Sequence, residues 1–322
     1  MEAVKVVETE LEKVRTAAER FATNVGKVLV GKDQTVRLIF VALLCEGHVL
    51  VEDVPGVGKT LLARSSARSL GSSFRRIQCT PDLLPSDIMG LQYFNPKTSE
   101  FEFRPGPIVA NIVVIDEINR AMPRTQSALL ECMQERQITV DLATLPLPRP
   151  FLILATQNPI EQEGTFPLPE AQLDRFLLQA GLGYPAADEE GAILARFGES
   201  NPLDTLTSVL SGEELLALQG ICRQVFVEPS VAGYLVGLVR ATRDHADVRL
   251  GASPRASLGL HQAAQALAAI QGRNFVIPDD IKALAVPVLS HRLILKPEAR
   301  LRGCTAATVI EGLLETLPVP AD

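Results

Sequence analysis

The chain has no tryptophan, and aromatic residues make up only 5% of its 322 positions. Surfaces that stack nucleic-acid bases or sugars need aromatic side chains, so this scarcity argues against such a surface. Positive charge is also in the minority, because the formal net charge is -7. No overall field draws the chain to nucleic acid or to an anionic membrane, and we expect neither as a partner.

Cysteine and histidine are few and scattered. The five cysteines never stand at C-x-x-C spacing, and the four histidines are equally dispersed. This pattern supports neither a disulfide framework nor a zinc site, and it favours buried thiols in a reducing compartment. The cysteines are Cys45, Cys79, Cys132, Cys222 and Cys304.

Long apolar runs and a secretory leader are absent as well. The first residues lack the apolar core of a signal peptide, and the longest apolar run, 38–45, is too short to cross a bilayer. We therefore expect a cytoplasmic protein without membrane insertion.

A length of 322 residues predicts two domains, preceded here by an amphipathic helix over 1–25. Apolar residues in this helix recur three and four apart, which places one apolar stripe on a helix. A short coiled coil is conceivable, but three heptads are its lower limit, so we expect docking on the chain's own globular part. The stripe comprises Val4, Val7, Leu11, Val14, Ala18, Phe21 and Val25.

The segment 26–184 alternates helices with short apolar strands, which is typical of a parallel sheet covered on both faces. Five strands are predicted, at 48–52, 74–79, 112–116, 151–156 and near Leu177. Two inserted hairpins are expected at 93–104 and 138–147. The segment 185–322 lacks such strands and predicts a helical domain, with helices at 187–198, 211–223, 229–246, 255–271 and 279–290.

A candidate phosphate-binding loop follows the first strand and opens a helix. Small residues there let backbone N–H groups surround phosphates, Lys59 adds positive charge, and the Thr60 hydroxyl is a ligand for Mg²⁺. One position departs from the G-x-x-x-x-G-K-[ST] template, because Asp53 stands where its first glycine would be. The candidate nucleotide-binding residues are Pro55, Gly56, Val57, Gly58, Lys59, Thr60 and Leu61.

Two further apolar strands end in polar residues. The third strand ends in Asp116, which is placed to hold Mg²⁺, and Glu117 beside it is placed to polarise the attacking water. Asn158 follows the fourth strand and would reach the same crevice, although asparagine before proline is also a common turn residue. Arg175 and Arg255 are candidate cations for the γ-phosphate; without the other motifs, a surface role would be the default for each.

Together these segments resemble the MoxR family of AAA+ ATPases. The resemblance covers about residues 25 to 300 and rests on four strings: D-E-I-N-R-A at 116–121, A-T-Q-N-P at 155–159, L-P-E-A-Q-L-D-R-F at 168–176 and G-A-S-P-R-A at 251–256. It implies an AAA+ P-loop NTPase core of the α/β class, with a parallel five-stranded sheet, followed by an all-α lid.

The resemblance also implies residue roles. Gly56, Gly58, Lys59 and Thr60 match Walker A, Asp116 and Glu117 match Walker B, and Asn158 matches sensor 1. Arg175 matches the arginine finger given to the neighbouring subunit, and Arg255 the sensor 2 arginine. Val30 and Gly31 match the segment that lines the adenine pocket. The hairpins match inserts that face the pore or one rim of a hexameric ring.

The resemblance implies ATP and Mg²⁺ as cofactors and a chaperone-like activity that remodels, assembles or activates partners. No von Willebrand factor A module lies in this sequence, so we expect such a protein, or another client, as a separate chain. One alternative is the ATPase subunit of a metal chelatase. Another is a nucleotide switch or a DNA-dependent ATPase, against which the intact Glu117 and the scarcity of basic charge and aromatics argue.

Overall fold

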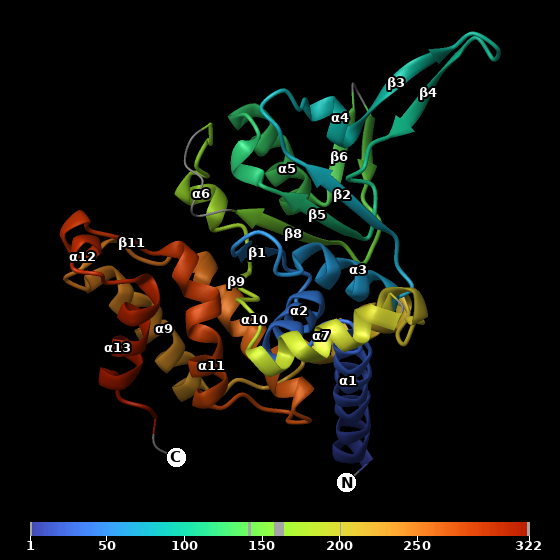
Figure 1. The fold of residues 1–322 in the computed structure, drawn as a ribbon. Helices are drawn as coiled ribbons and strands as arrows, with labels where there is room; N and C mark the ends of the chain where they lie inside the picture. Colours follow the sequence, from blue (N-terminus) through green and yellow to red (C-terminus); the bar gives the residue numbers. More distant parts are fainter. Residues whose placement is uncertain (1, 141–142, 158–163, 200, 321–322) are drawn as a thin grey trace.

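A computed structural model describes residues 2–140, 143–157, 164–199 and 201–320 of the chain (Figure 1). Its centre is one parallel sheet with the strand order β2-β5-β8-β1-β9. Because the strands are parallel, their carboxyl ends share one edge, where polar residues from separate strands meet. This confirms the predicted sheet. Its strands are β1 (Val49–Glu52), β2 (Phe74–Gln78), β5 (Ile112–Asp116), β8 (Leu152–Gln157) and β9 (Leu178–Ala180).

The inner strands β5 and β8 are buried on both faces of the sheet. Val114 and Leu154 belong to one apolar cluster, whereas their neighbours Val113 and Ile153 belong to another. Successive side chains of a strand point to opposite faces, so each cluster covers one face. The helices of this part are α2 (Asp33–Leu44), α3 (Lys59–Ser69), α4 (Pro85–Met89), α5 (Pro123–Glu135) and α6 (Glu170–Leu173), with a 3₁₀ turn, η1 (Ile118–Arg120).

Two antiparallel hairpins leave the sheet region, as predicted. The first pairs β3 (Gly90–Asn95) with β4 (Glu100–Pro105), and Figure 1 shows it extending away from the rest of the molecule. The second pairs β6 (Gln137–Val140) with β7 (Ala143–Pro146). The turn of the second hairpin, 141–142, lies outside the described residues.

The first helix, α1 (Glu2–Gly26), docks on the chain's own body, as expected. Phe21 is fully buried, and its ring centroid lies 5.0 Å from that of Phe40 on α2. Asn24 is also buried and donates to Ser69 Oγ at the end of α3, at 3.0 Å. The side chains of Val4 and Val7 lie outside the described part of the structure.

The remainder of the chain is mainly helical, and every helix predicted after 185 is present. Its elements are α7 (Ala187–Glu199), η2 (Pro202–Thr205), α8 (Gly212–Cys222), α9 (Pro229–Asp244), β10 (Val248–Leu250), α10 (Pro254–Ile270), α11 (Pro278–Leu289), η3 (Ser290–Arg292), β11 (Ile294–Leu295), α12 (Pro297–Leu301) and α13 (Ala306–Thr316). Sequence reasoning missed the small β10-β11 ladder, because strands of two and three residues carry no readable periodicity. Among the described helices, none has the length and apolar character needed to cross a membrane.

Candidate functional site

The loop between β1 and α3 has a backbone that requires glycine at two positions. Gly56 has a φ of 86° and Gly58 a φ of 101°, in the left-handed region that side chains disfavour. Gly58 directly precedes α3, so the first N–H groups of that helix lie beside the loop. Helix N-termini of this kind stabilise anions, phosphates above all.

Lys59 is the first residue of α3, and its Nζ donates to the Asp53 carbonyl oxygen at 2.6 Å. Burial lowers the pKa of Lys59, and the nearby carboxylates of Asp53, Asp116 and Glu117 oppose that shift. The ammonium group lines a cavity of about 390 Å³. This cavity brings together Pro55, Gly56, Gly58, Lys59, Thr60 and Leu61 with Arg76, Gln78, Asp116, Glu117 and Thr156.

Asp116 and Glu117 stand at the carboxyl end of β5. Asp116 is 8% exposed, and the backbone of Glu117 adopts the left-handed conformation, with a φ of 55°. Thr156 on β8 holds both residues: it accepts from the Glu117 N–H at 2.9 Å and donates to Asp116 Oδ1 at 3.3 Å. Thr156 therefore fixes the Asp116 carboxylate and the Glu117 backbone at one edge of the sheet.

Sequence reasoning missed the polar partners of these carboxylates. Arg76 on β2 donates from Nε to Asp116 Oδ2 at 2.5 Å, and Gln78 Nε2 donates to Glu117 Oε2 at 3.2 Å. Arg120 Nε lies 3.1 Å from the same Glu117 oxygen. The strand 74–79 was predicted, but only the sheet order shows that β2 lies beside β5. The available signal was the alternation that puts Arg76 and Gln78 on one face of that strand.

The donor set fits a magnesium–nucleotide complex. Thr60 and Asp116 offer the hard oxygen ligands that Mg²⁺ prefers, and they line the same cavity as Lys59. The N-terminus of α3 and the Lys59 ammonium supply positive charge for phosphates. A cavity with these groups at the carboxyl edge of a parallel sheet is chemically suited to phosphoryl transfer.

Val30 and Gly31 lie apart from the residues that line this cavity. A Cβ on Gly31 would fall 1.6 Å from Glu189 Oε1 of α7, so Glu189 packs directly over this glycine. The segment nevertheless flanks the loop, because a Cβ on Gly58 would lie 3.6 Å from Leu29 Cδ2. Val57, also predicted to bind nucleotide, packs against the main apolar cluster as a partly buried residue.

Asp53, the departure from the loop template, makes contacts that a glycine would lack. Its Oδ2 accepts from the N–H groups of Leu182 at 2.5 Å and Gly183 at 2.8 Å. Its Oδ1 accepts from the N–H of Val54 at 2.9 Å. The carboxylate therefore ties the start of the candidate phosphate-binding loop to the segment that follows β9.

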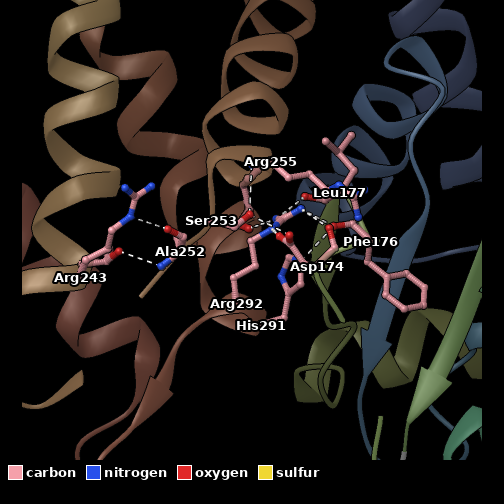
Figure 2. A network of polar contacts seen from close by, with 11 residues as sticks. Asp174, Phe176, Leu177, Arg243, Ala252, Ser253, Arg255, His291 and Arg292 are labelled. Atoms are coloured by element: carbon pink, nitrogen blue, oxygen red, sulfur yellow. Dashed lines mark hydrogen bonds and ion pairs between the residues drawn. The ribbon is translucent and has the colours of Figure 1, made fainter. Parts of the chain in front are cut away.

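The predicted arginines do not line the cavity. Arg175 Nη1 donates to the Leu130 carbonyl oxygen on α5 at 2.7 Å, and Arg255 is exposed in the first turn of α10. Both adjoin a polar network, shown in Figure 2, in which Asp174 accepts from Ser253 at 2.7 Å and from Arg292 at 2.8 Å. Asn158 lies outside the described residues.

Two family models match the chain. The family described as ATPases associated with various cellular activities matches residues 48–178, and the AAA lid domain matches residues 240–313. The first range spans the central sheet from β1 to the start of β9 and the second contains α10 to α12.

Curated proteins match over nearly the full length. "Uncharacterized protein YeaC" of Bacillus subtilis is 50% identical, over 92% of this chain and 93% of its own. "Chaperone MoxR1" of Mycobacterium tuberculosis is 46% identical, over 94% of this chain and 82% of its own length. "Protein MoxR" of Methylorubrum extorquens is 32% identical, over 95% of this chain and 96% of its own length. A crystal structure of a candidate ATPase from Cytophaga hutchinsonii has a TM-score of 0.92 and 37% identity, with all of both chains covered.

Proposed function

The chain belongs to the MoxR family of AAA+ ATPases, and on this premise we propose that it hydrolyses ATP to remodel, assemble or activate partner proteins. One observation carries the proposal: Lys59, Asp116 and Glu117 line a single cavity at the carboxyl edge of the sheet. Cation, metal ligand and base are the three groups that phosphoryl transfer to water requires. The relative named as a chaperone, MoxR1, supports the remodelling role.

In this proposal the backbone of 56–60 and the Lys59 ammonium bind the phosphates of ATP. Thr60 and Asp116 would hold Mg²⁺, which neutralises phosphate charge when bound. Glu117 accepts the proton of the attacking water, and Asn158 orients that water. Val30 and Gly31 border the adenine, a role supported by their neighbour Leu29, whose Cδ2 would lie 3.6 Å from a Cβ on Gly58 of the loop. Pro55, Val57 and Leu61 complete the loop.

We assign residues 1–25 to a docking helix, 26–184 to the nucleotide-binding domain and 185–322 to the lid. Arg175 serves as an arginine finger and Arg255 as the sensor 2 arginine of a homo-oligomeric, six-membered ring. Supporting this, neither arginine lines the cavity of its own chain. The hairpins face the pore or one rim, the partner is a von Willebrand factor A protein or another client, and the assembly works in the cytoplasm.

The test compares two variants of the cavity. Lys59→Ala removes the ammonium that faces the phosphates, so ATP affinity should fall strongly. Glu117→Gln keeps the side-chain shape but removes the base, so ATP should still bind while turnover falls by a factor on the order of 100 or more. Isothermal titration with Mg-ATP and phosphate release measure the two effects.

Lys282→Ala provides the matched control, because Lys282 lies on α11 outside the cavity lining and pairs with Asp279 in the preceding turn. It should bind and hydrolyse ATP like the unmodified chain. Undiminished turnover in Glu117→Gln, or unchanged ATP affinity in Lys59→Ala, would contradict the assignment of this cavity.

A further inference from the structure

Asp174 connects two parts of the fold that each carry a candidate phosphate-directed arginine. It ends α6 and immediately precedes Arg175 in the chain. Its Oδ2 accepts from Ser253 Oγ at 2.7 Å, and its Oδ1 accepts from Arg292 Nε at 2.8 Å. Figure 2 shows this carboxylate between Ser253, at the start of α10, and Arg292 of η3.

Arg292 fixes the backbone turn around Arg175. It is 7% exposed, and its guanidinium donates to the carbonyl oxygens of Asp174 at 3.3 Å, Phe176 at 2.6 Å and Leu177 at 3.0 Å. A planar guanidinium with several fixed donors holds a set of acceptors in one arrangement. The carbonyl groups on both sides of Arg175 are therefore held by one side chain.

His291 supports the same turn. Its Nε2 lies 3.1 Å from the Phe176 carbonyl oxygen, and burial lowers the pKa of His291 to about 3. The imidazole is therefore neutral at pH 7, with its proton on Nε2 as the donor to that carbonyl.

Ser253 fixes the backbone of the second arginine. Its Oγ accepts from the Arg255 N–H at 3.1 Å as the N-cap of α10, while its hydroxyl proton goes to Asp174. Arg175 and Arg255 are therefore linked by the peptide bond from Arg175 to Asp174, the Ser253–Asp174 hydrogen bond, and the chain from Ser253 to Arg255. Arg255 also lies near enough for its charge to lower the pKa of Arg292, after the larger effect of burial and against the opposing effect of Asp174.

We propose that Asp174, Ser253 and Arg292 are positioning residues that hold Arg175 and Arg255 at a fixed separation, so that both reach one ATP together. The proposal rests on the roles assigned above to the two arginines. A buried ion pair stabilises a fold little more than apolar packing of the same volume would, because desolvation offsets the attraction. Its directional bonds instead fix geometry, which catalytic groups require to within about 0.5 Å.

The experiment replaces Ser253 by two residues. Ser253→Gly removes the bond to Asp174, while glycine is a tolerated N-cap residue that costs little helix stability. Its kcat for ATP should fall at least about tenfold, since misplacing a catalytic group by about 1 Å has effects of that size or larger. The Kd for Mg-ATP should stay within about twofold. Ser253→Thr keeps the hydroxyl and should keep the kcat.

Ser211→Gly is the matched control, because Ser211 is also the N-cap serine of a helix, α8, and its Oγ accepts from the backbone N–H of Glu214. It should leave kcat unchanged. Ser253→Gly combined with Arg255→Ala should lose less activity than the product of the two separate losses, because Ser253 acts through Arg255. Independent, multiplying losses would overturn the proposal, as would a kcat for Ser253→Gly equal to that of Ser211→Gly.

The same measurements separate this proposal from the proposed function. If Glu117→Gln abolishes turnover while Ser253→Gly leaves it intact, the positioning proposal alone fails. If Glu117→Gln keeps full turnover, the ATPase assignment fails first.

Discussion

Arg76 forms an ion pair with the Asp116 carboxylate, the group that we assign as a ligand of Mg²⁺. The metal ion and the arginine therefore compete for Asp116. Arg76 is 53% exposed, and an ion pair with an exposed partner contributes about 0–1 kcal/mol. Arg76→Gln should therefore lower the Mg²⁺ concentration needed for half-maximal ATP binding, by up to about fivefold. Titration of ATP binding against Mg²⁺ measures this.

Arg75→Gln is the control for Arg76, because Arg75 directly precedes it on β2 and successive side chains of a strand point to opposite faces. It should leave the Mg²⁺ requirement unchanged. A higher Mg²⁺ requirement in Arg76→Gln would show instead that the arginine assists nucleotide binding.

His48 makes the stability of the core depend on pH. It is 4% exposed, its Nε2 lies 3.0 Å from Met133 O, and its Nδ1 accepts from Ile153 N at 3.0 Å. Burial lowers the pKa of His48 to about 4, so the folded chain keeps it neutral where the unfolded chain binds a proton. Its stabilising contribution is complete above about pH 6.5 and is lost as the pH falls towards 4.

Between pH 6.5 and pH 5 the loss from His48 should be about 2 kcal/mol of unfolding free energy, at about 1.4 kcal/mol per pH unit. Urea unfolding at pH 7 and pH 5 measures it. His48→Gln does not titrate and should show a correspondingly smaller difference between the two pH values. An equal pH dependence in both proteins would mean that His48 does not resist protonation.

At the level of single residues, sequence reasoning predicted those that a local motif defines. Gly56, Gly58 and Lys59 could be placed because a short loop and the helix after it determine their positions. Arg76 and Asp53 could not, because their partners lie 40 and about 130 positions away in the chain. Only the strand order and the path of the chain after β9 bring those partners together.

Among the elements, the β3-β4 hairpin carries an exposed aromatic pair that belongs to none of the apolar clusters of the described residues. Phe94 and Phe101 are 52% and 70% exposed, and their rings lie edge to face with centroids 5.5 Å apart. Replacing both with serine should leave folding and basal ATP hydrolysis within about twofold, since exposed substitutions shift stability by about 0.5 kcal/mol or less. Protection of a heat-denatured test protein from aggregation should be lost.

The control for the hairpin is Leu301→Ser on α12, where the leucine is 89% exposed. It removes one strongly exposed apolar side chain elsewhere on the molecule and should leave protection intact. If the hairpin variant protects the test protein as well as the control does, client binding does not depend on this aromatic pair.

The elements themselves were largely predictable, because amphipathic periodicity and buried apolar runs are local signals. The five strands and both hairpins lie within a few residues of their predicted bounds. What periodicity could not predict is how α8 and α10 pack. Leu215 on α8 and Leu260 on α10 belong to the same apolar cluster as Phe21 of α1 and Phe40 of α2. Residues assigned to the lid therefore share a core with the first helices.

At the scale of the whole molecule, the role proposed for Arg175 is the one that a ring needs and a self-sufficient enzyme does not. Its guanidinium donates to Leu130 O on α5, and it does not line the cavity that holds Lys59. An arginine that serves a neighbouring subunit matters only at an interface. Arg175→Ala should therefore bind ATP almost normally but hydrolyse it poorly, as phosphate release and titration would measure.

Mixed assemblies test the interface directly. Lys59→Ala has a defective cavity but an intact arginine, whereas Arg175→Ala has the reverse, so each variant alone should be nearly inactive. In a mixed ring, an Arg175→Ala subunit beside a Lys59→Ala neighbour has both an intact cavity and a donated arginine, and it should hydrolyse ATP. Activity should rise with the fraction of such pairs and be greatest near an equal mixture. If mixed rings form, yet activity never exceeds the sum of the separate preparations, Arg175 does not act on a neighbouring subunit.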